Sequence, residues 1–491
     1  MIELKFNDQN YTYDIYHIVK AFFPDAKITQ KMDTEQDAYV DISVTELGIT
    51  YKVCPEDVDK EKRDDKKERK HEMNILVYRW LAKTTGKEIS WGILTGIRPT
   101  KIAMTMLEEG KSRDEIIGHY REHDMVSEEK ASLGYEIAKR EKALLEQLDY
   151  DNGYSLYVGI PFCPTTCSYC SFTSYPIAAW KDRVDEYLDA LEKELTFIGE
   201  ISKDKKLNTV YMGGGTPTTL SPEQLDRLLT HLERTFSYDD LKEITVEAGR
   251  PDSITREKLK VLREHRINRI SINPQTMQQK TLDVIGRKHT VEDIVRVFQM
   301  AREEGFDNIN MDLIAGLPGE EESDMRDTLD QIMELAPDSI TVHSLALKRA
   351  SKLGQEKKLQ IREGQEDDKD STQQMADRLS GMIRIAENYA RRMQLEPYYM
   401  YRQKNIAGNF ENVGYAKVDK AGIYNILIME EKQTIIAAGA GASTKAVFPG
   451  RPGYGGKNQK RIERAENVKD VSQYIARIDE MIERKGELLW R

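Results

Sequence analysis

The sequence predicts an α/β protein with an incomplete (β/α)6 barrel that is open on one side, preceded by an α+β N-terminal domain and followed by a C-terminal α/β covering domain. Two observations predict the barrel. From Ser155 on, apolar strand-like runs alternate with helical segments six times, which is typical of parallel strands joined by helical crossovers. Six units rather than the eight of a closed barrel indicate that one side stays open. We place the domains at residues 1–150, 151–347 and 348–491.

The first domain begins with short strands and a helix. Residues 1–6 and 38–53 alternate apolar and polar side chains, which predicts strands with one buried face. Between these runs, residues 13–23 have helical spacing. The charged run from Lys60 to His71 leads into apolar residues spaced for one helix face. We therefore interpret that run as the solvated start of a helix rather than as a nucleic-acid patch.

Further helices complete this domain. Pro99 could start a helix, because its fixed φ suits a first helical turn. Ser112 and Ser127 carry the hydroxyl group that caps the N-terminus of a helix. The last of these helices is predicted to run to about Leu148. The turn at residues 151–153 then gives the domain boundary.

The barrel strands are expected to present functional residues at their carboxyl ends, because parallel strands bring these ends to one edge of a barrel. A stretch GGGTPT at residues 213–218 follows the second strand, and its missing side chains let the backbone approach a ligand closely. A tight turn between strand and helix is the alternative. The six strands are predicted at residues 156–160, 209–213, 243–249, 269–273, 308–316 and 339–347.

The C-terminal domain is predicted to cover the open side of the barrel. Residues 348–371 are polar and are expected to form a long connection. An amphipathic helix over 372–393, strands over 397–405 and 424–430, and a final helix over 471–485 should follow. The stretch GAGAS at residues 439–443 again permits close approach of the backbone.

The composition indicates a soluble globular protein and excludes some function classes. The 491 residues are 39% hydrophobic and 32% charged, and no apolar run is long enough to span a bilayer. The net charge of -11 argues against a general nucleic-acid binder, which needs a basic surface. Polar residues interrupt any apolar core in residues 1–20, so we expect no signal peptide there. Four cysteines without a spaced framework indicate a cytoplasmic protein.

Three cysteines carry the strongest functional signal. Cys163, Cys167 and Cys170 have the spacing C-x-x-x-C-x-x-C on one short loop. Three thiolates can hold three irons of a 4Fe-4S cluster and leave the fourth iron open for an exogenous ligand. A structural zinc site would need a fourth ligand, and neither a His nor a Cys follows closely. A redox disulfide is the less favoured alternative, because disulfides are rare in a reduced cytosol.

This loop, together with Tyr157 before it and Tyr169 within it, resembles the cluster loop of radical S-adenosylmethionine (SAM) enzymes. Within these enzymes the chain resembles oxygen-independent coproporphyrinogen III oxidase (coproporphyrinogen dehydrogenase) and its relatives, most closely the HemZ-type proteins. The resemblance runs from about residue 88 to residue 445 and includes several separate motifs. It implies a radical SAM barrel with a 4Fe-4S cluster and SAM as cofactors.

The resemblance also assigns a SAM site. It implies that Gly214, Gly215 and Thr216 meet the amino group of SAM and that Arg287 binds its carboxylate, for which a bidentate guanidinium is suited. The ribose and methionyl parts would be contacted by Glu247, Gln275 and Asp312, and Ala346 would close the adenosyl pocket. The GAGAS stretch matches the family's substrate-side loop in position.

Two residues depart from the family pattern. The best-characterised oxidases have a fourth cysteine where this chain has Phe172, and related haem carriers also have Phe there. Those carriers have an H-N-x-x-Y haem motif in the C-terminal domain, whereas the corresponding stretch here begins with Glu411. A carboxylate is a poor replacement for imidazole at haem iron, so haem carriage is disfavoured, although another ligand could serve.

The resemblance implies oxidative decarboxylation of coproporphyrinogen III to protoporphyrinogen IX in haem biosynthesis, through hydrogen abstraction from the propionates by a 5'-deoxyadenosyl radical. A flavodoxin or ferredoxin would deliver the electron. Arg98 and Lys101 could face a propionate of the substrate or pack against the barrel. The alternatives are a haem-binding chaperone of the same family and a radical enzyme that acts on another tetrapyrrole or carboxylate.

Overall fold

The computed structural model describes residues 1–172, 174–345, 351, 353–355, 372–402, 410–448 and 461–490. These residues form two compact units. The N-terminal unit contains residues 1–139 and, from the later chain, 372–380, 401–402 and 410–411. The barrel unit contains the other described residues. The division into three domains remains a prediction, and its second boundary lies outside the described residues.

The N-terminal unit starts with a four-stranded sheet in the order β2-β1-β3-β4. β1 (Ile2–Phe6) and β3 (Val40–Val44) alternate buried and partly exposed side chains, as their sequence pattern predicts. β2 (Ile28–Met32) pairs in parallel with β1, and β4 (Ile49–Val53) is antiparallel to β3. β2 was not among the predicted strands.

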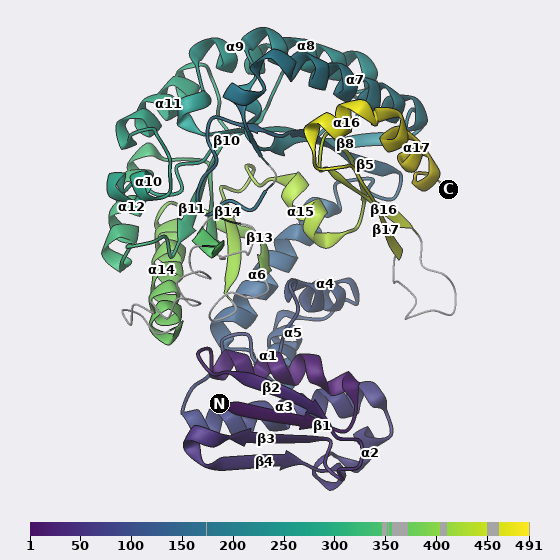
Figure 1. The fold of residues 1–491 in the computed structure, drawn as a ribbon, viewed down its shortest axis with the longest axis vertical. Coiled ribbons are helices and arrows are strands. Elements are labelled where there is room, and N and C mark those ends of the chain that lie inside the picture. Colours follow the sequence, from purple (N-terminus) through teal and green to yellow (C-terminus); the bar gives the residue numbers. More distant parts are fainter. Residues whose placement is uncertain are drawn as a thin grey trace. The chain divides into compact units, whose positions relative to one another are not determined.

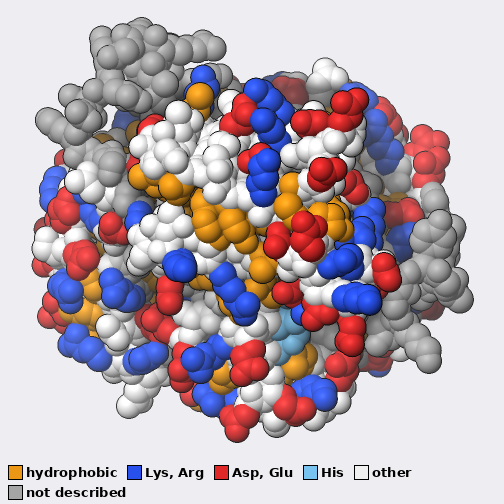
Figure 2. All heavy atoms as spheres, turned by 90° about the horizontal axis from the view of Figure 1, so that it is seen from below, with side chains coloured by type: hydrophobic (Ala, Val, Ile, Leu, Met, Phe, Trp, Pro, Cys, Tyr) orange, Lys and Arg blue, Asp and Glu red, His pale blue; other side chains and the backbone are white. Residues whose placement is uncertain are grey.

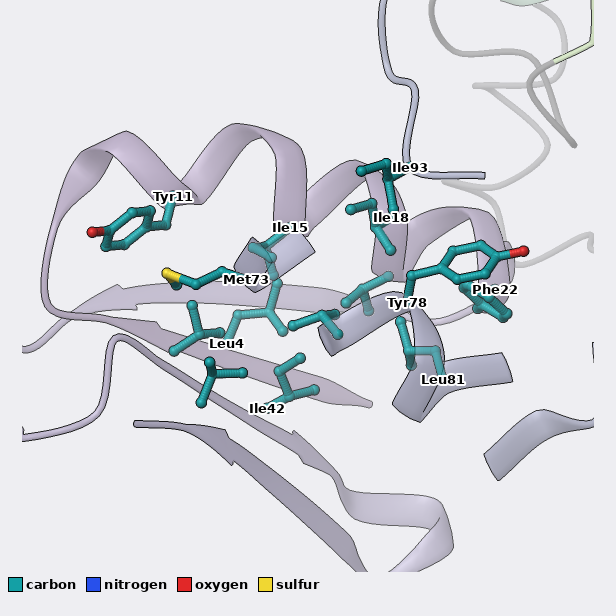
Figure 3. Packing of buried hydrophobic residues seen from close by; sticks show 14 of the residues in the cluster. Leu4, Tyr11, Ile15, Ile18, Phe22, Ile42, Met73, Tyr78, Leu81 and Ile93 are labelled. Atoms are coloured by element: carbon teal, nitrogen blue, oxygen red, sulfur yellow. The ribbon is translucent and has the colours of Figure 1, made fainter. Parts of the chain in front are cut away.

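Two helices bury one face of this sheet. α1 (Thr12–Phe22) and α3 (Lys66–Thr85) contribute Ile15, Phe22 and Met73 to a core that also contains Leu4 and Ile42 of the strands (Figure 3). The charged run before α3 forms the short helix α2 (Lys60–Arg63) and the exposed first turn of α3, in agreement with the prediction. The shared apolar core holds the helices on the sheet.

The rest of the N-terminal unit is helical. α4 (Thr100–Glu108) begins after Pro99, and Ser112 forms a capping box with Glu115 in α5 (Arg113–Gly118), so both predicted starts are confirmed. A π-helical turn (His119–His123) follows α5. The last helix, α6 (Glu128–Leu145), ends slightly before the predicted Leu148 and runs on into the barrel unit.

The barrel unit has the six predicted parallel strands as the centre of one large sheet. Neighbouring strands pair in chain order throughout this set. The strands are β5 (Gly153–Ile160), β8 (Lys206–Gly214), β9 (Glu243–Gly249), β10 (Arg269–Ile272), β11 (Ile309–Ala315) and β12 (Ser339–Ser344). This arrangement confirms the incomplete α/β barrel.

Helices follow these strands and form an arc on the outer side of the sheet (Figure 1). They are α7 (Val184–Ile201), α8 (Pro222–Thr235), α9 (Arg256–Glu264), α10 (Gln279–Val284), α11 (Val291–Glu303) and α12 (Glu322–Leu335). Ser221 caps α8 with Gln224, which confirms the helix start predicted after the glycine stretch. The concave side of the sheet is therefore the side left for the site.

C-terminal strands extend this sheet at both ends. β14 (Glu411–Ala416) is antiparallel to β12 and is flanked by β13 (Glu396–Arg402), while β15 (Thr434–Ala438) pairs in parallel with β5. β16 (Ser443–Phe448) and β17 (Arg461–Glu466) continue the sheet beyond β15. The predicted amphipathic helix is α14 (Thr372–Arg392). The predicted final helix is divided into α16 (Val471–Ala476) and α17 (Ile478–Leu488).

One predicted strand is wrong. Residues 424–430 lie in the helix α15 (Ile423–Glu430). A short apolar run has no clear period, so its pattern does not separate strand from buried helix. The structure shows what decides the matter: the carboxylate of Glu243 accepts the backbone N–H of Ile423 at 2.5 Å and so caps the helix from a distant strand.

α15 fills the inner side of the sheet near the amino ends of the strands. It places the ring of Tyr424 against Tyr211 of β8, with 4.4 Å between the ring centroids, and Tyr157 of β5 stacks on both rings, with centroids 6.2 Å from Tyr211 and 6.4 Å from Tyr424. These aromatic rings fill part of the barrel interior. Tyr157 also borders a cavity at the carboxyl end of β5.

The surface carries mixed charges. In Figure 2, basic and acidic side chains are interspersed over the face in view, without a large area of one sign. Among the described residues, no helix has both the length and the apolar character needed to cross a membrane.

Candidate functional site

The cysteine loop leaves the barrel at the carboxyl end of β5. Its start forms the short strand β6 (Phe162–Cys163), which pairs with β7 (Tyr175–Pro176) at its end. Within the loop, the backbone N–H of Cys170 donates to the carbonyl of Cys167 at 3.1 Å. The two ends of the loop are therefore held together. The cysteines lie between them, beyond the carboxyl end of β5.

The three thiols lie close enough to interact electrostatically. Cys167 is buried and the other two are partly buried. Burial raises the pKa of Cys163 and of Cys170, and the charge of the Cys167 thiolate adds to the rise in both. The thiolates of Cys163 and Cys170 are therefore costly to form without a cation close by. The donor set therefore fits an iron–sulfur cluster, whose irons supply that charge.

Two buried guanidinium groups flank Cys167. Nη1 of Arg250 lies 3.7 Å from the Cys167 Sγ atom and donates to the carbonyl of Thr165 at 2.8 Å. Arg287 donates to the hydroxyl of Tyr169 at 3.2 Å and to the carbonyl of Asn273. Burial alone would lower the pKa of Arg287, but Tyr169 and Cys167 outweigh this and raise it. Two guanidinium groups thus lie beside the buried thiol.

Arg250 is locked in place by a carboxylate. Its Nη2 and Nε atoms donate to the two oxygens of Asp252 at 2.6 and 2.9 Å. Burial would raise the pKa of Asp252, but hydrogen bonds from His289 and Arg250 lower it well below its usual range. Our sequence reasoning missed Arg250. Its position directly after the predicted strand 243–249 was the available signal.

The glycine stretch packs against the cysteine loop. The backbone N–H groups of Gly215 and Thr216 donate to the carbonyls of Ile160 and Phe162, each at 2.7 Å. A Cβ atom on Gly215 would lie 2.5 Å from the Phe162 oxygen and 3.0 Å from Cys163 Sγ, so no side chain fits there. Gly214 has a φ of 110°, which favours glycine. The close approach of this backbone is therefore made to the cysteine loop itself.

Thr216 completes this contact, since its hydroxyl donates to Cys163 Sγ at 3.6 Å. The hydrogen bond lowers the pKa of the Cys163 thiol against the effect of burial. Because the Gly215 and Thr216 N–H groups are already used, the role predicted for this stretch toward an ammonium group would fall to carbonyl oxygens, which accept hydrogen bonds.

Glu247 lies on the concave side of β9 and is hydrogen-bonded to the Tyr211 hydroxyl, which donates to its Oε1 atom at 2.5 Å. Burial raises the pKa of Glu247 to about 7, and the nearby Asp312 adds to the rise. Glu247 can therefore change between an acceptor and a donor of hydrogen bonds near neutral pH.

Gln275 and Asp312 are held next to each other. The backbone N–H of Gln275 donates to the Asp312 carbonyl at 3.0 Å, and the φ of Gln275 is 69°, which is unusual for a residue other than glycine. Backbone strain of this kind gathers at functional sites. Burial would raise the pKa of Asp312, but the nearby His343 and the hydrogen bond that Asn310 donates at 2.7 Å lower it.

His343 is a second residue that our sequence reasoning missed. It lies on β12, and its Nε2 atom is 3.8 Å from the Asp312 carboxylate. A histidine inside an otherwise apolar barrel strand was the signal. Ala346, predicted to close the adenosyl pocket, lies outside the described residues.

A cavity of about 200 Å³ adjoins the cysteine loop. Its lining residues include Tyr157, Gly214, Phe172, Ala440 and Lys469. The stretch 439–443 thus borders the same cavity as the cysteine loop, and its place on the substrate side remains a prediction. It is anchored from behind, because the backbone N–H of Gly439 donates to the buried carboxylate of Glu194 at 2.8 Å.

The structure thus brings most of the predicted residues to the carboxyl ends of the barrel strands. The cysteines, the glycine stretch, Tyr157, Tyr169 and Arg287 are joined by the contacts given above, and Glu247, Gln275 and Asp312 line the neighbouring strands. Their individual roles toward a ligand remain predictions. Arg287 also contacts Tyr169 of the cysteine loop, which the predicted carboxylate-binding role does not require.

Comparison with known proteins defines the class of this site. The family model described as the Radical SAM superfamily matches residues 157–332, which include the cysteine loop and five of the six barrel strands. A solved structure described as coproporphyrinogen III oxidase (HemN) from Escherichia coli shares the fold, with a TM-score of 0.51 at 24% sequence identity, and covers 70% of this chain and 73% of that chain.

Curated relatives narrow the class. The chain is 40% identical over 427 residues to the oxygen-independent coproporphyrinogen-III oxidase-like protein HemZ of Bacillus subtilis (strain 168), covering 86% of this chain and 81% of that protein. The chain belongs to this HemZ-type family of radical SAM proteins. It is also 42% identical over 194 residues to the heme chaperone HemW of the same organism, which covers 39% of this chain and 50% of the chaperone.

The cofactors of this family are a 4Fe-4S cluster and SAM. The three thiols on one loop fit the cluster, since burial raises the pKa of Cys163 and Cys170 and bound iron supplies the positive charge that favours their thiolates. The Nε atom of the buried Arg287 has no hydrogen-bond partner among the described residues, so this guanidinium keeps a donor for an anionic ligand such as a carboxylate.

Proposed function

We propose that the chain catalyses the oxygen-independent oxidative decarboxylation of coproporphyrinogen III to protoporphyrinogen IX. The observation that carries this proposal over haem carriage is the state of Glu411. Its carboxylate is buried, forms an ion pair with Lys130 at 2.6 Å and accepts the indole N–H of Trp91 at 2.8 Å. A carboxylate committed to these two partners is a poor ligand for haem iron.

The cofactors, when bound, supply one-electron reduction and a carbon radical that can take a hydrogen atom from the substrate. The chain's own residues position these groups. Cys163, Cys167 and Cys170 hold three irons, and Arg287 binds the SAM carboxylate. Glu247, Gln275 and Asp312 contact its ribose and methionyl parts.

The cavity beside the cysteine loop is suited to one carboxylate-bearing arm of the substrate. Lys469 is a cation on its wall, and a propionate is the anion that it would orient. Phe172 also lines the cavity and is 72% exposed, so it offers an apolar face to a pyrrole edge. Holding the propionate at Lys469 keeps its reacting carbon near SAM and limits access of water.

A haem-binding chaperone is the second candidate, favoured by the similarity to HemW over 194 residues. The test is an anaerobic incubation of the cluster-loaded protein with coproporphyrinogen III, SAM and a reductant, followed by chromatography, beside a haem titration. We expect protoporphyrinogen IX and 5'-deoxyadenosine in matched amounts and only weak haem binding. Tight one-to-one haem binding without product, while SAM is cleaved, would replace the oxidase with the chaperone.

Two further parts of the function belong to this proposal. A flavodoxin or ferredoxin is the class of electron donor that a low-potential cluster needs. The thiols that hold the cluster require a reducing compartment, so we infer that the protein works in the cytoplasm.

A further inference from the structure

Three of the chain's eight histidines gather around one aspartate in the N-terminal unit. His71 comes from α3, whereas His119 and His123 come from the π-helical turn after α5, which Asp124 directly follows. The ligand atoms of His71, His123 and Asp124 lie within 4.8 Å of one another. This cluster has no part in the radical SAM site.

The backbone puts two of these histidines on one side of their turn. His119 and His123 are four residues apart, which is the spacing that places two imidazoles on one helix face for a metal ion. Single π-helical turns are rare overall but frequent at functional sites. The His123 ring stacks between the other two, at 3.7 Å from His71 and 4.3 Å from His119.

Asp124 is the unusual member of the cluster. It is only 3% exposed, its Oδ1 atom lies 2.9 Å from Nδ1 of His123, and its Oδ2 atom lies 3.7 Å from Nε2 of His119. This second oxygen has no hydrogen-bond partner among the described residues. A buried carboxylate oxygen without a partner is costly, so the arrangement is suited to a cation.

The position of Asp124 is set by its backbone. Its carbonyl accepts the N–H of Ile93 at 3.0 Å, and a Cβ atom on Gly92 would lie 2.1 Å from the same oxygen. Met125 next to it has a φ of 59°, in the left-handed region. A strained, tightly packed backbone thus holds the carboxylate toward the imidazoles before any ligand arrives.

We propose that this cluster is a binding site for a divalent zinc ion, with His71, His123 and Asp124 as ligands and His119 beside them. Imidazole nitrogen together with one carboxylate oxygen is a donor set that zinc prefers, whereas calcium and magnesium prefer oxygen ligands alone. The side chains of His119 and His123 are 34% and 43% exposed, so an ion can enter from solvent. Small rotations of the stacked rings bring their nitrogens onto the ion.

The bound ion joins α3 to the turn that precedes α6. Both elements belong to the N-terminal unit, where apolar residues of the helix Lys66–Thr85 join the core and His71 Nε2 already lies 3.0 Å from the carbonyl oxygen of His123. An ion that binds only the folded state stabilises it by mass action. The site is therefore structural, and its loss should leave the cluster chemistry of the barrel unit unchanged.

The test uses the full-length chain in two forms. In one, Cys163, Cys167 and Cys170 are all replaced by Ser, so that thiolates of the loop cannot take zinc; the other is the anaerobic, cluster-loaded wild type. Zinc is titrated by calorimetry, and cobalt(II) serves as an absorbing substitute. We expect one zinc ion per chain in both forms and a cobalt spectrum without the near-ultraviolet bands of thiolate ligation.

Variants of the cluster separate this site from adventitious binding. We expect His123→Ala to remove the zinc and its effect on thermal unfolding, and Asp124→Asn, which keeps the shape, to weaken zinc binding about 10- to 100-fold. His231→Ala, at a histidine outside the cluster, is the matched control and should bind zinc normally. Absence of zinc binding in both forms, or binding that is unchanged in Asp124→Asn and His123→Ala, would overturn the proposal.

Discussion

The cysteine loop and the surroundings of Glu411 both bury ionisable groups, and they treat them in opposite ways. The guanidinium groups of Arg250 and Arg287 lie beside Cys167, yet burial keeps the pKa of Cys170 raised. The cysteine loop therefore lacks part of its countercharge until iron binds. At Glu411, Lys130 and Trp91 supply both a countercharge and a hydrogen bond. A buried charge left without full compensation marks a place for a ligand, whereas a compensated one holds the fold together.

The largest effect should follow from removing one cluster ligand. Cys167→Ser leaves two thiolates on the loop, too few to hold a four-iron cluster. We expect the anaerobically purified variant to be colourless and to cleave no SAM, as measured by iron analysis and by 5'-deoxyadenosine formation.

Cys54→Ser is the matched control, because Cys54 lies in the N-terminal unit. It should keep the brown colour and about four irons per chain. A Cys167→Ser protein with full iron content would remove the cluster assignment.

Breaking the compensated pair should be the next largest effect. Glu411→Ala removes the buried carboxylate that pairs with the ammonium group of Lys130, which is only 8% exposed, and keeps its pair with the more exposed Glu129. We expect a loss of about 3–5 kcal/mol in the free energy of unfolding, measured by denaturant titration.

The double variant Glu411→Gln with Lys130→Met keeps an acceptor for Trp91 and removes both charges, so most of the loss should be recovered. If it is as unstable as Glu411→Ala, packing rather than charge explains the effect. The pKa of Glu411 is lowered in the folded protein, because Lys130 outweighs burial. Its contribution to stability is therefore present above about pH 4.5 and is lost as the pH falls through the lowered pKa.

Glu247 should give a pH effect of the opposite sign. Its pKa is raised from 4.5 to about 7, so the unfolded chain loses this proton first as the pH rises. Folding stability of the cofactor-free protein should therefore fall between about pH 4.5 and pH 7, by up to about 3 kcal/mol from this group. Glu247→Gln, which copies the protonated form, should flatten this part of the stability curve. An unchanged curve would contradict the raised pKa.

Substitutions of the two arginines beside Cys167 should have different effects, because Arg287 is proposed to bind SAM and Arg250 contacts the thiol. Arg287→Ala removes the donor proposed for the SAM carboxylate, so SAM affinity should fall about 10- to 100-fold, as a lost charged hydrogen bond implies. Equilibrium dialysis with SAM measures this, and iron content should stay normal. Loss of the cluster with unchanged SAM affinity would mean that Arg287 serves the loop alone.

Arg250→Gln should have the smallest effect. It removes a positive charge and a donor near the thiolate of Cys167, and such hydrogen bonds raise the potential of a cluster. We expect a lower reduction potential, read by redox titration of the cluster spectrum, with SAM affinity unchanged. Arg250→Lys keeps the charge and should lie between wild type and Arg250→Gln. A potential equal to that of wild type in Arg250→Gln would limit Arg250 to holding Thr165.

Much of the fold and of the site was predictable because its signals are local. The cluster ligands stand on one loop, so their spacing is visible in the chain, and each barrel strand is a compact apolar run between turn residues. Pro99 and Ser112 indicate where their helices start, because the fixed φ of proline and the serine hydroxyl group favour a helix N-terminus. None of these predictions depends on contacts between residues that are distant in the chain.

Tertiary structure decided whatever depends on partners distant in the chain. Residues 424–430 became a helix because Glu243 caps them, and Glu411 became an ion-paired residue because Lys130 and Trp91 surround it. Arg250 is a candidate site residue because it contacts Cys167, and Asp124 is a candidate ligand because the imidazole of His71 lies near it. The sequence by itself therefore determined the six barrel strands, the starts of α4, α5 and α8 and the cluster loop, because the signals for these features lie in residues close together in the chain. Only folding decided the charges and contacts of the site, because burial and long-range pairing set them.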